Sequence, residues 1–173
     1  MTLASGDPQA QSLSLAAGLA LIEAVDTALP GLPLLLKWPN DLLLDSAKVA
    51  GILLERQNDR VVAGFGVNLA AAPQIEDRRA AHLGRRIGPD AFAPLLAASM
   101  SRMVSLWRTT DPADFAKAWL ARAHPVGTEL WVHGADWGMV RGRFDGLDRD
   151  GSLRLRLPDG SVRAIHAADV TLG

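Results

Sequence analysis

The stretch Leu34–Glu55 reads LLLKWPNDLLLDSAKVAGILLE, and the fold and function that we predict for this chain depend on it. It is mostly leucine, but four polar residues interrupt the apolar run at short spacing: Lys37, Asn40, Asp41 and Lys48. Burying a charge among apolar side chains is costly unless the charge is paired or faces a ligand. The stretch therefore predicts a site in which these charges hold one another or a bound molecule.

The same stretch and its continuation are typical of antiparallel strands. Leu34–Trp38 predicts a short buried strand that ends at a proline. Leu42–Leu44 and Val49–Glu55 flank the polar turn Asp45–Ala47, which predicts a hairpin with a longer loop. After an Asn-Asp turn, Val61–Leu69 predicts one more strand. We expect a meander of antiparallel strands.

Side chains in the last of these strands alternate between two faces. Gly64, Gly66 and Asn68 share one face and leave a bare strip that ends in an amide. Glycine inside a strand weakens it unless something approaches the backbone closely. The strip predicts either a bound small molecule, or a packed helix or bulge at this place.

Helical segments precede and follow the strands. Apolar residues in Gln11–Leu29 recur close to every 3.6 residues and predict an amphipathic helix that Pro-Gly ends. Ile75–Ile87 predicts a short charged helix, and Asp90–Trp107 carries an apolar helical stripe. Asp111–Pro112 supplies an N-cap and a first-turn proline for a helix that runs to about Ala123.

The composition changes after the last helix, and we place a domain boundary between residues 123 and 124. The rest of the chain has no helical period, and His133, Asp136 and Trp137 are expected as turn residues, although His133 also ends an alternating segment. Four alternating segments predict a small all-β module, a compact barrel. These segments are Glu129–His133, Gly138–Leu147, Ser152–Leu157 and Val162–His166.

Composition excludes several classes of site. The 173 residues include no cysteine, which removes disulfides and thiolate zinc sites, and the four histidines have no ligand-like spacing. The formal net charge of −1 argues against a broad nucleic-acid footprint. No apolar run reaches the ~20 residues of a membrane span, and no basic region precedes Leu13–Leu21 as in a signal peptide. We expect a cytoplasmic protein.

The order of motifs resembles the signature of biotin–protein ligases. In that family KWPND is followed by K-x-x-G-I-L and then by a glycine-rich strand that ends in G-x-N. Here Lys37–Asp41 supplies the first part, Lys48 with Gly51–Leu53 the second, and Gly64–Asn68 the third. The match is specific because all three parts occur in order, and the resemblance covers nearly all of the chain.

The resemblance implies an α+β fold in two domains. Residues 1–123 would form a mixed or antiparallel sheet flanked by helices, as in the biotin/lipoate ligase catalytic fold, and residues 124–173 a small SH3-like β-barrel. Family members also carry an upstream glycine- and arginine-rich loop that closes over biotin and the adenylate. Residues 1–33 contain nothing similar, so we expect a catalytic domain that is truncated at its N-terminus.

The resemblance further implies a two-step reaction that uses ATP, Mg²⁺ and biotin. Biotin and ATP form biotinyl-5'-AMP, and a lysine of a biotin carboxyl carrier domain then takes the biotin. Lys48 would contact the biotin carboxylate and the α-phosphate and stabilise the transition state, because joining two anions requires a cation. Gly51 and Gly64 would let biotin lie on bare backbone. Trp38 either borders the ligand or fills the core.

Four residues are candidates for nucleotide binding, each with a structural alternative. Lys37 lies either beside the phosphates or in an ion pair with Asp41. Asp41 is a candidate Mg²⁺ or nucleotide ligand, or it closes an Asx turn. Asn40 has the same structural alternative, which we favour there. Asn68 reads adenine through its amide or caps its strand.

Other functions remain open at this point: a non-catalytic remnant that binds nucleotide or the carrier domain, or a lipoate–protein ligase, which shares the fold. We expect no nucleic-acid partner, because no helix-turn-helix is visible, no membrane partner, and a homodimer as an option. No ligand contact is assigned to Val170–Gly173. A set of alternating arginines predicts a solvated face or a docking surface for an acidic acceptor domain: Arg141, Arg143, Arg154, Arg156 and Arg163.

Overall fold

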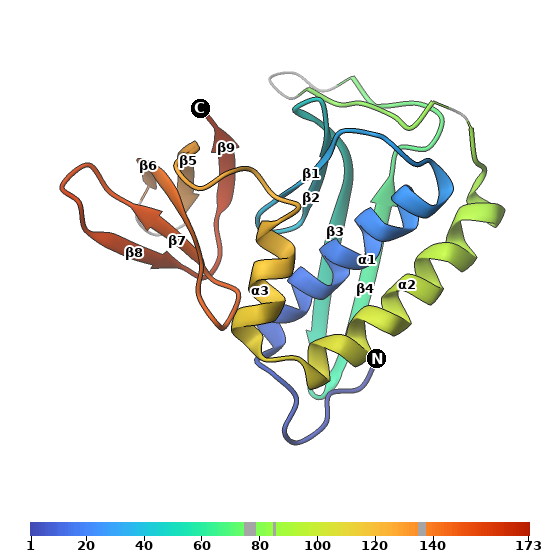
Figure 1. Ribbon diagram of the computed structural model, residues 1–173, viewed down its shortest axis with the longest axis horizontal. Coiled ribbons are helices and arrows are strands. Elements are labelled where there is room, and N and C mark those ends of the chain that lie inside the picture. The colour runs from blue at the N-terminus through green and yellow to red at the C-terminus, as the bar shows by residue number, and fades with distance from the viewer. Residues whose placement is uncertain (75–78, 85, 135–137) are drawn as a thin grey trace.

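Two antiparallel sheets, with helices packed on the first, make up the α+β fold of the chain (Figure 1). The computed structural model describes residues 1–74, 79–84, 86–134 and 138–173. The predicted fold class is confirmed. The helical elements are a short 3₁₀ turn at Ala10–Ser12, α1 (Leu13–Ala28), α2 (Pro89–Thr109) and α3 (Pro112–Leu120).

The first sheet has the strand order β1-β2-β3-β4, as the meander prediction requires. Its strands are β1 (Leu34–Lys37), β2 (Asp41–Leu44), β3 (Ala47–Gln57) and β4 (Arg60–Val67). The β2–β3 turn is shorter than we predicted, because Ala47 already belongs to β3. Asp45 and Ser46 both have positive φ, 47° and 63°, as a two-residue hairpin turn requires.

Helix α1 is the centre of the core rather than an amphipathic surface helix. Its buried residues lie all around the helix because the first sheet covers one side and α2 packs on another (Figure 1). Gly18 lets Trp119 of α3 approach closely, since a Cβ there would lie 3.1 Å from the Trp119 Nε1. The prediction of an amphipathic helix is therefore wrong. The helix is apolar on all sides because leucine and alanine make up most of it, and such a helix is buried.

Helices α2 and α3 begin within one residue of the predicted positions, and α3 ends at Leu120, before the predicted end near Ala123. Phe92, Met103 and Trp107 of α2 are buried in the core. The Asp111 carboxylate accepts the backbone N–H of Ala113 at 2.8 Å and caps α3. Local side-chain chemistry was enough to place both helices.

The predicted helix over Ile75–Ile87 is wrong for the part of it that the structure describes. Arg79–Leu83 is extended, and Ala80 forms a parallel bridge with Lys48 of β3. Hydrogen bonds to distant residues satisfy the backbone of this segment, so tertiary pairing overrides its local helix propensity. Residues 75–78 and 85 lie outside the described part of the chain.

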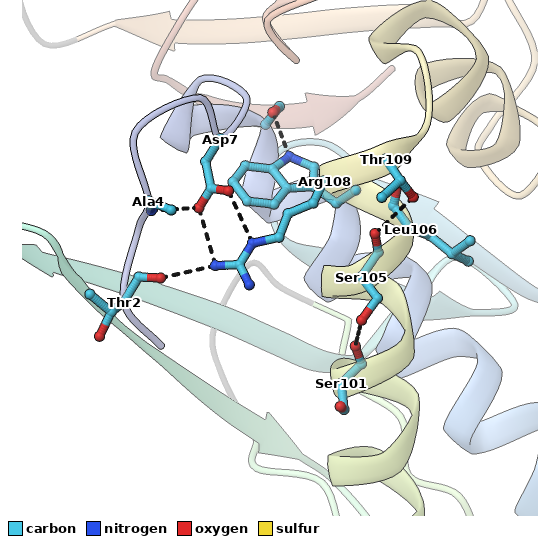
Figure 2. Close-up of polar contacts among 10 residues, drawn as sticks. Thr2, Ala4, Asp7, Ser101, Ser105, Leu106, Arg108 and Thr109 are labelled. Atoms are coloured by element: carbon cyan, nitrogen blue, oxygen red, sulfur yellow. Dashed lines mark hydrogen bonds and ion pairs between the residues drawn. The ribbon is translucent and has the colours of Figure 1, made fainter.

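The N-terminal residues are fastened to α2 and β4. Figure 2 shows the Arg108 guanidinium directed at the Asp7 carboxylate and the Thr2 carbonyl, with donor–acceptor distances of 2.9 to 3.1 Å. The backbone N–H of Ala4 and the Arg108 guanidinium hold the pKa of Asp7 below its usual value. The Met1 main chain pairs with Val61, with N···O distances of 2.7 and 2.9 Å. Residues 1–3 therefore lie along the start of β4, and Asp7 is held to α2.

The second sheet has the order β8-β7-β6-β5-β9. Four of its strands match predicted segments, and the fifth, at the end of the chain, was not predicted. The predicted small all-β module is confirmed as a five-stranded antiparallel sheet, in which no pairing of β8 with β9 occurs among the described residues. The strands are β5 (Glu129–Gly134), β6 (Gly138–Leu147), β7 (Leu153–Arg156), β8 (Val162–Ile165) and β9 (Asp169–Leu172). The turn expected at Asp136 and Trp137 lies outside the described residues.

Three arginines of the second sheet form ion pairs at the surface of the protein. Arg154 and Arg156 both bind the Asp145 carboxylate, at 2.9 and 2.7 Å, and hold the pKa of Asp145 below its usual value. Arg141 pairs with Glu129 at 2.7 Å. These ion pairs leave less positive charge for an acidic partner than the sequence pattern indicated. Separately, none of the described helices has the length and apolarity that a membrane crossing requires.

Candidate active site

Three of the charged residues in the leucine-rich stretch meet around one carboxylate. Lys37 ends β1, Asp41 begins β2, and the two are strand partners. The Lys37 Nζ lies 3.0 Å from the Asp41 Oδ2, and the Lys48 Nζ of β3 lies 2.5 Å from the Asp41 Oδ1. Asp41 is 8% exposed, whereas the Lys48 side chain is 43% exposed. The cluster therefore carries one net positive charge and presents Lys48 toward solvent.

Asn40 fastens the loop between β1 and β2 to β3. Its Nδ2 donates to the Ile52 carbonyl at 2.7 Å, and the Ile52 N–H donates to the Asn40 carbonyl at 2.9 Å. These two bonds fix the position of Asp41, the next residue. They favour the structural alternative for Asn40 over the nucleotide contact.

Gly51 makes room for the charge cluster. A Cβ at this position would lie 3.0 Å from the Lys48 Nζ and 3.6 Å from the Asp41 Oδ1. The Lys48 ammonium thus lies directly against the bare Gly51 backbone. In the sheet, Gly51 is the partner of Gly66 on β4.

No contact within the described part of the protein requires a glycine at Gly64 or Gly66 of β4. A Cβ at Gly64 or Gly66 would meet its nearest protein atom at 3.8 or 3.9 Å, an ordinary contact. Both residues are exposed, and no described helix covers them. Of the alternatives for the bare strip, a packed helix is therefore excluded within the described residues, and no bulge occurs in the β3–β4 register. The remaining alternative is a bound small molecule that lies on the open backbone beside the Lys48 ammonium.

Asn68 closes the strip and holds the neighbouring segment. Its side-chain Nδ2 donates to the Ala81 carbonyl at 2.9 Å, and its backbone carbonyl accepts the Leu83 N–H at 2.8 Å. The amide nitrogen is thus engaged within the protein. This contact favours the strand-end role over adenine recognition.

A cleft of about 280 Å³ contains the charge cluster. Lys37, Asp41 and Lys48 line it together with residues that the sequence did not point to: Arg79, and Asp169–Leu172 of β9. The second sheet therefore contributes a wall of the site, although no contact was expected there. The alternating pattern of Asp169–Leu172 was the available signal for a strand, but nothing in it indicated the cleft.

Trp38 is a core residue that joins the two sheets. It is 3% exposed, and its Nε1 donates to the carbonyl of Gly151, in the turn before β7, at 3.0 Å. The Trp38–Pro39 peptide bond is cis. The core alternative for Trp38 is confirmed. Its neighbour Lys37 is thereby fixed relative to the second sheet.

His124, at the junction of the two sheets, is buried next to the site. It is 6% exposed, its Nδ1 has no hydrogen-bond partner among the described residues, and its ring meets Phe144 edge-on. Burial and the positive charge of Lys37 lower the pKa of His124 to about 4. The imidazole is therefore neutral in the folded protein at neutral pH.

The first prediction concerns the dependence of stability on pH. Between pH 6.5 and 4 the unfolded chain binds a proton at His124 that the folded chain does not, so stability falls as the pH falls through this window. This difference in pKa corresponds to about 3 kcal/mol of unfolding free energy. Urea unfolding from pH 7.5 to 4.5 measures it. His124→Gln should flatten the dependence, and an unchanged slope in that variant would contradict the prediction.

The geometry does not fit Mg²⁺ bound by Asp41. Each oxygen of this carboxylate lies within ion-pair distance of a lysine ammonium group, and the described residues contain no group of three acidic or histidine side chains that could hold a metal. A Mg²⁺ ion prefers one or two free carboxylates together with phosphate oxygens. We therefore derive no step from a metal at Asp41.

Comparison with known proteins gives consistent results. Residues 5–69 match the sequence model described as "Biotin/lipoate A/B protein ligase family", and residues 138–173 match "Biotin protein ligase C terminal domain". A biotin–[acetyl-CoA-carboxylase] ligase of Paracoccus denitrificans is 37% identical, over 95% of this chain and 74% of its own length. One from Mycobacterium tuberculosis is 34% identical, over 91% of this chain and 61% of its own length.

Solved structures share the fold. The biotin protein ligase from Aquifex aeolicus in complex with biotin and ATP superposes with a TM-score of 0.80. The alignment covers 95% of this chain and 72% of that one, at 23% sequence identity. Together with the identity to the Paracoccus ligase, the KWPND-type motif, the bare strip and the lysine-lined cleft lead to one assignment: the chain belongs to the biotin–protein ligase family.

Proposed function

We propose that this chain catalyses the ATP-dependent ligation of biotin to a lysine of a biotin carboxyl carrier domain. The main support for this proposal is the position of the Lys48 ammonium, which lies against Gly51 and next to a strip of open backbone. The strip can receive the apolar part of biotin, and the ammonium can receive its carboxylate. The names of the Paracoccus and Mycobacterium relatives support the same reaction.

In the first step a biotin carboxylate oxygen attacks the α-phosphorus of ATP. A new oxygen–phosphorus bond forms, the bond from the α-phosphorus to the bridging oxygen breaks, and pyrophosphate leaves with that electron pair. Lys48 offsets the repulsion between the two anions and the negative charge that develops at phosphorus. Asp41 positions the ammonium by its contact at 2.5 Å, and Lys37 offsets the charge of Asp41 from the other side.

In the second step the amine of an acceptor lysine attacks the acyl carbon of biotinyl-5'-AMP. The new carbon–nitrogen bond replaces the carbon–oxygen bond, AMP leaves, and the amine loses a proton to solvent. The exposed side of the Lys48 side chain leaves space for this approach. We propose a carrier domain of a biotin-dependent carboxylase as the partner and the cytoplasm as the compartment.

Two alternatives are weaker. A lipoate–protein ligase is compatible with the first family match, but the match of residues 138–173 to a biotin protein ligase C-terminal domain favours biotin. A non-catalytic remnant that binds nucleotide or the carrier domain would lack the adenylation step. Adenylation therefore separates this second alternative from the proposal.

The test measures the two steps separately. Purified protein is incubated with biotin, Mg²⁺ and ATP labelled at the α-phosphate, and biotinyl-AMP is followed by chromatography. A carrier domain is then added and probed with streptavidin, with lipoate in place of biotin as the specificity control. Adenylate formation and carrier labelling with biotin support the proposal. Nucleotide binding without adenylate would establish the remnant instead, and a preference for lipoate would establish the other ligase.

A second prediction tests the bare strip. Gly66→Val adds a side chain where the protein leaves open space, so the free energy of unfolding should stay within about 1 kcal/mol of wild type. The added methyl groups occupy the strip, and biotin affinity should fall about ten- to a hundred-fold. Isothermal titration with biotin measures the effect. Val62→Thr, on the same face of β4, is the control that should bind normally, and full biotin affinity in Gly66→Val would remove the strip from the site.

A further inference from the structure

The segment Arg79–Leu83 is fixed against the site by its backbone. The Lys48 N–H donates to the Arg79 carbonyl at 2.8 Å, and the Ala81 N–H donates to the Lys48 carbonyl at 2.9 Å. The segment is also held by both bonds of Asn68 described above, and Leu83 is buried in the core. Although it belongs to the long connection between β4 and α2, this segment has a defined register relative to Lys48.

Arg79 brings a third cation into the cleft. The charges of Lys37 and Lys48 are both turned to Asp41, whereas within the described part of the chain the Arg79 guanidinium forms no ion pair. Asp169 of β9 lines the same cleft and has an interaction of its own. The lining therefore holds three cations and two carboxylates, and Arg79 is the cation that forms no ion pair with a described carboxylate.

We propose that Arg79 binds the β- and γ-phosphates of the nucleotide, the part that leaves as pyrophosphate. This inference rests on the function proposed above, in which Lys48 serves the α-phosphate. The backbone of Arg79 is hydrogen-bonded to that of Lys48 and both residues line the same cleft, so one nucleotide bound there can meet both side chains. The planar guanidinium binds phosphate through two parallel hydrogen bonds, which a lysine cannot reproduce.

The test compares three ligands and three variants. Wild type, Arg79→Ala and Arg79→Lys are titrated calorimetrically with Mg²⁺-ATP, AMP and inorganic pyrophosphate. Arg86→Ala is the matched control, an exposed arginine of the same connection that does not line the cleft. Arg79→Ala should weaken ATP and pyrophosphate binding about ten- to a hundred-fold. AMP binding should stay unchanged, and Arg79→Lys should recover part of the loss.

The outcomes separate this inference from the proposed function. If wild type forms biotinyl-AMP and Arg79→Ala binds ATP equally well, Arg79 has no such role. If the variant loses AMP affinity as much as ATP affinity, Arg79 contacts the nucleoside or the α-phosphate, and the assignment to the leaving phosphates is overturned. If wild type binds no nucleotide at all, the proposed function itself fails and the inference fails with it. Unchanged melting curves show that each variant is folded.

Discussion

Lys48→Ala is expected to reduce the rate of biotinyl-AMP formation about a hundred- to a thousand-fold, the usual cost of losing one preorganised group that stabilises developing charge. The Lys48 ammonium lies 2.5 Å from Asp41 and against the Gly51 backbone, so it is held in place before substrate arrives. Its removal leaves the two reacting anions without a cation between them. The measurement is the single-turnover rate of adenylate formation at saturating ATP and biotin.

The control for this variant is Lys117→Ala. Lys117 is exposed on α3 and pairs with Asp114 on the surface, so its removal should leave the rate unchanged. Lys48→Ala should remain folded, because Lys37 still pairs with the buried Asp41 at 3.0 Å. An adenylation rate in Lys48→Ala within a few-fold of wild type would remove Lys48 from the chemistry and with it the main support for the proposed mechanism.

Trp38→Ala is expected to destabilise the protein by about 3–5 kcal/mol, the range for truncating a large buried aromatic side chain. For a chain of this size the melting temperature should fall by roughly 6–20 °C. The substitution opens a cavity between the two sheets and leaves the Gly151 carbonyl without the indole donor at 3.0 Å. Urea and thermal unfolding measure the loss.

Two variants divide this effect into packing and hydrogen bonding. Trp38→Phe keeps most of the buried volume but loses the bond to Gly151, so it should cost only about 1–2 kcal/mol. Trp131→Ala removes a half-buried indole that stacks under Arg141 in the second sheet, and it should cost less than Trp38→Ala. A Trp38→Ala variant as stable as wild type would show that Trp38 does not join the two sheets.

The residues of the candidate site were predictable from the sequence, but the contacts that these residues make with one another were not. Lys37, Asp41 and Lys48 stood out because charges in a leucine-rich stretch need partners. For Lys37 the ion pair with Asp41 at 3.0 Å favours the structural alternative, and the phosphate contact stays a prediction. For Asn40 the hydrogen bond to Ile52 favours the structural role, which the sequence could not separate from nucleotide binding because an amide side chain can serve either.

Two errors show where sequence patterns fail. The stretch over residues 75–87 has helix-forming composition, yet Arg79–Leu83 is extended because its backbone pairs with Lys48 and Asn68. The end of the chain was assigned no role, yet β9 lines the cleft because it pairs with β5, about 40 residues earlier in the chain. Both depend on contacts between residues far apart in the sequence.

The sequence by itself determined the strands, turns, caps and helices whose signals are local, such as the alternation in β4 and the Asp111 cap of α3. Only the tertiary structure decided which oxygen of Asp41 each lysine takes, that Arg79 enters the cleft, and that β9 closes one side of it. Local signals act through the backbone geometry of a few neighbouring residues. Pairing of groups that are distant in the sequence depends on the packing of the whole chain, so it cannot be predicted from any single stretch.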